Sequence, residues 1–123
     1  MKYERKIEID FYCPLEYGLD IFGGKWKSRI ICVLSVNNIM RYNELKKELN
    51  NITDAVFASM LRELIEDKII TRTQYNEIPP KVEYELTEKG LSVLPILQNI
   101  CIWSQRQTNE LNKKLPPCKT CEL

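Results

Sequence analysis

Residues 41–68 read "RYNELKKELNNITDAVFASMLRELIEDK" and contain two helix-forming segments separated by a short turn. In the first segment Asn43 is the expected cap, and Leu45 and Leu49 recur at the spacing of one helix face. The turn follows as "NNIT", and Thr53 is the expected cap of a second, longer helix. Two helices separated by a few residues make a candidate helix-turn-helix.

The second helix of this pair is predicted to be amphipathic. The apolar side chains that recur on its inner face are Phe57, Met60, Leu61, Leu64 and Ile65. The opposite face carries Asp54, Ala55, Ala58, Ser59 and Arg62. This spacing predicts one face packed on a core and one face left at the surface.

The residues after the two helices predict a β-hairpin. The segments "IITRTQY" (69–75) and "KVEYEL" (81–86) are rich in β-branched and aromatic residues, and "NEIPP" joins them as a loop. A short extended piece is also expected around residues 39–42, before the first helix of the pair. The order helix, helix, turn, helix, hairpin is that of a winged helix.

Two more helices are expected upstream of this unit. Cys13 stands at an N-cap position before Pro14, so a helix should run to about Phe22, where Gly23 and Gly24 end it. The next segment, "KWKSRIICVLSV", has an apolar stripe of Trp26, Ile30, Val33 and Leu34. Its polar residues are Lys25, Lys27, Ser28 and Arg29. Trp26 could stack on a ligand, but its place on the stripe favours the core.

The last predicted helix is capped by Thr87 and is apolar on nearly all sides from Val93 to Trp103. One small domain cannot bury all of these faces, so we expect a homodimer. The expected interface residues are Leu15, Leu94, Leu97, Ile100 and Trp103. The predicted fold class is therefore α+β, mainly α: a winged helix-turn-helix with a small β-hairpin wing and a C-terminal dimerisation helix.

Composition limits the size and setting of the protein. The chain has 123 residues, 44% of them hydrophobic, which suits one modest core. We expect an N-terminal extension over residues 1–12, the winged-helix domain over 13–112 and a tail over 113–123. No stretch predicts a membrane span or a secretory signal, so a cytoplasmic protein is expected. The net charge is only +1, and any polyanion must bind to a local basic patch.

The sequence offers little support for an enzyme. It contains no histidine, no glycine-rich phosphate loop and no nucleophile paired with a base, and we expect neither a cofactor nor a metal site. Cys118 and Cys121 form a CxxC pair, for which a thiol oxidoreductase is the remaining enzyme hypothesis. A shared zinc site in a dimer, or pairing with Cys13, also stays open. A third class is a winged helix used only for protein contacts.

Four stretches together resemble the HxlR-type winged-helix transcription regulators, a group related to MarR-type regulators. They are "CPLEYGLDIFGGKWKSRII", "RYNELKKEL", "IT…MLRELIEDKII" and "IPPKVEYELTEKG". The resemblance runs from about Cys13 to Trp103 and implies a dimeric DNA-binding regulator, often one that responds to oxidants, electrophiles or small toxic molecules. The chain departs from the family pattern at Asp54, at Ala55 and at Lys68, which replaces a usual glycine.

A helix-turn-helix places the N-terminal part of its second helix in the major groove of double-stranded DNA. The residues expected within reach of bases or phosphates there are Thr53, Asp54, Ala55, Ala58, Ser59 and Arg62. Phosphate contacts are expected from Arg41, Lys46, Arg72 and Lys81. For any single charge, plain solvation of an exposed face remains the alternative. A dimer would bind a near-palindromic operator.

Cys13 is the candidate sensor residue. A thiol at a helix N-cap faces unpaired backbone N–H groups and the positive end of the helix dipole, which favour the reactive thiolate. The nearby carboxylate of Glu16 opposes this effect. From the residues alone, a reactive thiol and a structural cap are equal alternatives, and the second would leave sensing to a small ligand. The resemblance favours redox sensing, with an oxidant or small electrophile as signal. Cys32 and Cys101 are expected to be packing groups.

Overall fold

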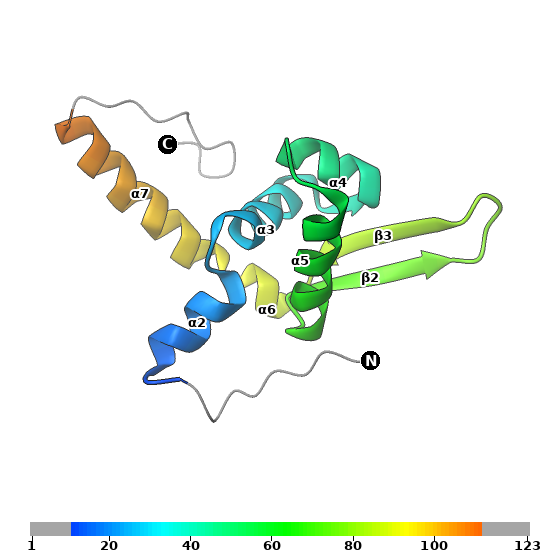
Figure 1. The fold of residues 1–123 in the computed structure, drawn as a ribbon, viewed down its shortest axis with the longest axis horizontal. Coiled ribbons are helices and arrows are strands. Elements are labelled where there is room, and N and C mark those ends of the chain that lie inside the picture. Colours follow the sequence, from blue (N-terminus) through cyan, green and yellow to red (C-terminus); the bar gives the residue numbers. More distant parts are fainter. Residues whose placement is uncertain (1–10, 112–123) are drawn as a thin grey trace.

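The computed structural model describes residues 11–111 of the chain. The elements are α2 (Pro14–Phe22), α3 (Lys25–Asn37), β1 (Ile39–Arg41), α4 (Tyr42–Leu49), α5 (Asp54–Glu66), β2 (Ile70–Tyr75), β3 (Lys81–Leu86), α6 (Glu88–Leu91) and α7 (Leu94–Glu110). This order, shown in Figure 1, confirms the winged helix-turn-helix. The predicted tail, with Cys118 and Cys121, and most of the predicted extension lie outside the described residues.

Helix α2 begins at Pro14 and is followed by two glycines, as predicted. A Cβ atom on Gly23 would lie 2.2 Å from the carbonyl oxygen of Leu19, and Gly24 has a φ of +82°. Only glycine tolerates both the close approach and the left-handed backbone. The pair therefore allows the sharp turn into α3.

The predicted cap of helix α4, Asn43, is wrong. The helix starts at Tyr42 with Arg41 as its N-cap, two residues earlier than a cap at Asn43 would allow. The cause is Glu44, whose Oε1 accepts a hydrogen bond of 2.8 Å from the backbone N–H of Arg41. A carboxylate three residues after the cap satisfies an otherwise unpaired donor. Asn43 therefore lies inside the first turn.

Helix α5 begins and ends with defined caps. The predicted cap Thr53 is confirmed, since its Oγ1 accepts a hydrogen bond of 3.2 Å from the N–H of Val56. At the other end, the N–H of Ile69 donates to the carbonyl oxygen of Leu64 and the N–H of Lys68 to that of Ile65. Lys68 itself has a φ of +62°. These bonds form a Schellman motif, in which the position held by Lys68 favours glycine.

The wing belongs to a three-stranded antiparallel sheet with the order β1-β3-β2. In the central strand, Tyr84 is the partner of Met40 on one side and of Arg72 on the other. The hairpin of β2 and β3 extends away from the helices in Figure 1. All side chains of residues 71–80 are exposed, so the wing presents its outer half to solvent.

The single C-terminal helix that the sequence predicts is divided in two. Thr87 caps only the short α6, where its Oγ1 accepts a 3.0 Å hydrogen bond from the N–H of Gly90. Pro95 lacks an N–H, and in a continuous helix its ring would collide with the carbonyl of Leu91. The chain therefore turns at residues 92–93 and starts α7, which projects from the body of the molecule in Figure 1.

None of the helices within residues 11–111 has the length and apolar character needed to cross a membrane.

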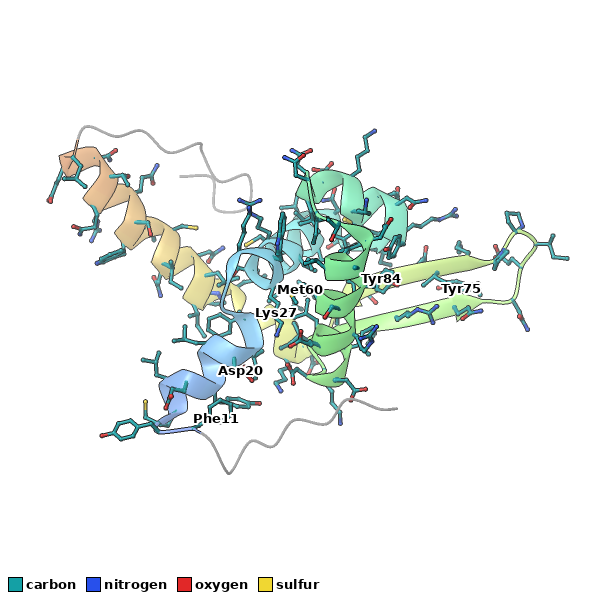
Figure 2. All side chains as sticks on the ribbon, in the orientation of Figure 1. Phe11, Asp20, Lys27, Met60, Tyr75 and Tyr84 are labelled. Atoms are coloured by element: carbon teal, nitrogen blue, oxygen red, sulfur yellow. The ribbon has the colours of Figure 1, made fainter. Side chains whose placement is uncertain are left out.

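The core surrounds α3. Ile30, Ile31 and Leu34 are buried, while Trp26 is half-buried and packs against the core, as its stripe predicts. Lys27 corrects the prediction of a polar outer face, because it is only 7% exposed. Its Nζ donates to the carbonyl oxygen of Asp20 at 3.1 Å and lies 3.0 Å from Oε1 of Glu63. Figure 2 labels Lys27 between α2 and α5, and the two contacts of its amine connect these helices.

Candidate nucleic-acid interface

The predicted DNA-facing side of α5 lies at the surface of the molecule. Four of its residues are exposed and two are half-buried. The exposed residues are Thr53, Asp54, Ala55 and Arg62, and the half-buried ones are Ala58 and Ser59. Behind them Phe57, Leu61 and Leu64 are buried, while Met60 and Ile65 are half-buried against the core. The amphipathic pattern therefore predicted the orientation of the helix correctly.

The carboxylate of Asp54 is held by two neighbours from α4. Its Oδ1 accepts a hydrogen bond of 3.2 Å from the hydroxyl of Tyr42 and lies 3.6 Å from Nζ of Lys46. Burial of Tyr42, followed by its hydrogen bond to Asp54, raises the pKa of this tyrosine. Lys46 thus offsets the negative charge that Asp54 would otherwise present to a phosphate backbone.

Arg62 of α5 and Arg72 of β2 line the same cavity of about 220 Å³. The other lining residues are Tyr42, Ala58, Leu61, Ile65, Glu66 and Tyr84. Arg72 donates a 3.4 Å hydrogen bond to the side chain of Gln74, and Arg62 has no ion pair within the described part of the chain. Two arginines from separate elements therefore line one cavity at the junction of helix and wing.

Arg41 and Lys81 line a second cavity, of about 700 Å³, between the start of α4 and the wing. The ammonium group of Lys81 lies 3.9 Å from Oε2 of Glu83 and 4.5 Å from the ring centroid of Tyr75. A hydrogen bond with Glu83 raises the pKa of Tyr75, which Figure 2 shows on the hairpin. Lys81 is thus already engaged by the wing, whereas Arg41 stays exposed.

Three residues of this surface were missed from the sequence. Tyr42 lines both cavities, and Lys47 joins Lys46 in a hollow beside the turn between the two helices. Val56 is 39% exposed, although an apolar residue in an amphipathic helix is expected to be buried. The helical position of Val56, a quarter-turn from Phe57, was the available signal.

Cys13 lies at the start of α2, far along the chain from α5. The residue is half-buried, and its N–H donates a 3.1 Å hydrogen bond to Oε2 of Glu16, which also accepts from the N–H of Tyr12. At the other end of the same helix, the carbonyl oxygen of Asp20 accepts from Lys27. Lys27 in turn contacts Glu63 of α5, so a chain of contacts links the helix of Cys13 to α5.

The residues predicted for a dimer interface divide into two groups. Leu15, Ile100 and Trp103 are 66%, 49% and 63% exposed, so they have apolar surface to offer a second copy. Leu97 belongs to the core of the single chain and Leu94 packs against it, which leaves them little surface for an interface. Further exposed apolar side chains nearby are Leu19, Leu91 and Ile96.

Comparison with known proteins agrees with this geometry. The HxlR-like helix-turn-helix family matches residues 21–118. An uncharacterized HTH-type transcriptional regulator of Halalkalibacterium halodurans is 39% identical over 108 residues, which cover 88% of this chain and 96% of that protein.

Two regulators, each solved in two chemical states, have structures similar to this chain. The redox regulator HypR in its oxidised form is 39% identical with a TM-score of 0.68, over 76% of this chain and 96% of HypR. Its reduced form gives a TM-score of 0.70. The reduced transcriptional regulator YodB from B. subtilis is 31% identical with a TM-score of 0.69, over 78% of this chain and 94% of YodB, and a diamide-treated form gives 0.67. The chain therefore belongs to the HxlR-like helix-turn-helix family and is a DNA-binding transcriptional regulator.

Proposed function

We propose that the protein binds a near-palindromic operator as a homodimer, and that oxidation or alkylation of Cys13 changes its affinity for DNA. The observation that carries the DNA-binding geometry is that Arg62 and Arg72 line the same cavity. A DNA strand that passes between the groove entered by a recognition helix and the groove reached by a wing places a phosphate at such a junction. Arg62 then positions the protein, and base reading falls to the first turns of α5.

The homodimer follows from the apolar surface on α2 and α7. Leu15, Ile100 and Trp103 would be covered by a second copy, which removes apolar area from water. Two copies related by a two-fold axis would present two α5 helices to half-sites about 34–36 Å apart. Both half-sites can be bound together only at that separation.

The thiol response rests on the position of Cys13 and on the similarity to HypR and YodB. A change at Cys13 would displace the start of α2, and the contacts of Lys27 with Asp20 and Glu63 would carry this displacement to α5. A small rotation of each α5 would then alter the separation of the two helices and hence operator affinity. A small ligand with Cys13 as a purely structural cap is the alternative. We propose action on DNA in the cytoplasm and no catalytic role.

The test is the affinity of the full-length protein for its own upstream DNA, at two salt concentrations, before and after a mild thiol oxidant. Specific binding should weaken steeply as salt rises, because phosphate contacts release counterions. The oxidant should change the affinity of the wild type and of Cys32→Ser but not of Cys13→Ser. An equal response in Cys13→Ser would reject the sensor role and leave DNA binding intact.

The same affinity measurement, made on two arginine variants, tests the proposed phosphate contacts. Arg62→Ala and Arg72→Ala should each reduce the salt dependence by about one counterion and weaken binding to all sequences alike. Arg106→Ala, an exposed arginine on α7, is the matched control and should leave binding unchanged. A loss of sequence preference in Arg62→Ala would show instead that Arg62 reads bases.

A further inference from the structure

The first turn of α5 presents methyl groups rather than long hydrogen-bonding side chains. Ala55 and Val56 are adjacent and both exposed, and Val56 is 39% accessible. Thr53, just before them, uses its hydroxyl oxygen to cap the helix and is also exposed. The end of the helix that would enter the major groove is therefore largely apolar.

The one charged residue of the first two turns, residues 54–61, is already engaged. Asp54 accepts a hydrogen bond from Tyr42 and pairs with Lys46. A carboxylate can read cytosine by accepting from its amino group, but both neighbours draw this one toward α4. Asp54 thus serves the contact between the two helices of the motif.

The nearest long polar side chain that points outward is Arg62, eight residues beyond Asp54. At about 1.5 Å of rise per residue, it lies about 12 Å farther along the helix axis. Arg62 also lines the cavity shared with Arg72, where a phosphate is proposed to lie. The first two turns therefore lack the arginine, lysine, asparagine or glutamine that makes a bidentate contact with guanine or adenine.

We infer that α5 recognises its operator chiefly through the C5-methyl groups of thymine, with Ala55 and Val56 as the specificity-determining residues. Thymine is the base that offers a methyl group in the major groove, and small apolar side chains pack against it. Each half-site should then carry thymine at the one or two positions beneath these side chains. This inference rests on the proposed binding of DNA through α5, and it adds the base class that is read.

The experiment replaces thymine by deoxyuridine, one position at a time, in the upstream duplex that the full-length protein binds. This change removes only the methyl group. Binding should weaken about fourfold at one or two positions in each half-site, the value expected for one buried methyl group. Val56→Ala should bind the thymine duplex more weakly and lose the discrimination at one of these positions, while Ala55→Gly should lose it at the neighbouring one.

Val36→Ala is the matched control, because Val36 is an exposed valine on α3 and the change removes the same two γ-methyl groups. It should keep the full deoxyuridine penalty. Melting followed by circular dichroism should show that Ala55→Gly and Val56→Ala are folded, since both side chains are at the surface. Specific binding that is indifferent to deoxyuridine at every position would overturn the inference and leave the proposed function standing. A Val56→Ala variant that keeps the full discrimination would also overturn it. Absence of DNA binding altogether would instead reject the proposed function.

Discussion

At the scale of single residues, Lys27 of α3 holds two other helices in place. Its charged amine is held by the carbonyl of Asp20 and by the carboxylate of Glu63, and these partners come from the helices on either side. A buried charge without a partner is costly, so the contact fixes how α2 and α5 sit on the core. The same residue is therefore both a structural and a coupling element.

Replacing Lys27 by methionine keeps the length of the side chain and removes its charge. We expect the free energy of unfolding to fall by about 1–3 kcal/mol, because two hydrogen bonds are lost while Glu63, with 26% of its side chain exposed, can regain water. Urea unfolding at a fixed protein concentration, followed by circular dichroism, measures this change. Lys47→Met, at an exposed lysine of α4, should change stability by less than about 0.5 kcal/mol. Equal effects of the two substitutions would contradict the role given to Lys27.

At the scale of elements, the two ends of α5 use different devices. Thr53 satisfies a backbone donor at the start, and the hydrogen bonds of Lys68 and Ile69 close the last turn. Leu64 and Ile69, both buried, complete the motif at that end. Lys68, where the chain departs from the family pattern, is thus a strained position. Its backbone lies in the left-handed region, which a residue with a Cβ atom disfavours.

Lys68→Gly should relieve this strain and raise the free energy of unfolding by about 0.5–1 kcal/mol. Thermal melting should show a higher midpoint for this variant. The control is Lys68→Ala, which removes the charge but keeps the Cβ atom, and it should leave the midpoint nearly unchanged. A lower midpoint for Lys68→Gly would mean that contacts of the lysine side chain outweigh the backbone strain.

At the scale of the whole molecule, α7 leaves much of its apolar surface uncovered within one chain. The helix projects from the domain in Figure 1, and Ile96, Ile100 and Trp103 along it are about half exposed or more. A helix with such a face is stabilised mainly by packing against another surface. The proposed homodimer provides that surface.

Ile100→Glu should therefore dissociate the dimer while each chain stays folded, because a carboxylate would have to be buried in the interface. Size-exclusion chromatography with light scattering reports the mass, and circular dichroism reports the fold. Ile78→Glu makes the same chemical change at the exposed tip of the wing and should leave the dimer intact. A variant at Ile100 that remains dimeric would place the interface elsewhere.

Much of the fold could be predicted because its signals are local. The Pro14 start of α2, the Thr53 cap and the strand over residues 81–86 each depend on residues a few positions apart, and the structure has each of them. The break before α7 also has a local cause in Pro95, but the apolar run around it concealed the interruption. The cap of α4 was missed because Glu44 selects Arg41, a residue type that seldom caps a helix.

The amino-acid sequence by itself determined the order of elements up to the wing, the outward face of α5 and the membership of a regulator family, since periodicity and motifs are properties of neighbouring residues. Only the tertiary structure decided which charges meet. Lys27 and Glu63 are 36 positions apart, and Arg62 and Arg72 share a cavity because a helix and a strand pack together. Burial and electrostatic pairing depend on residues distant in the chain, so no local pattern could have assigned them.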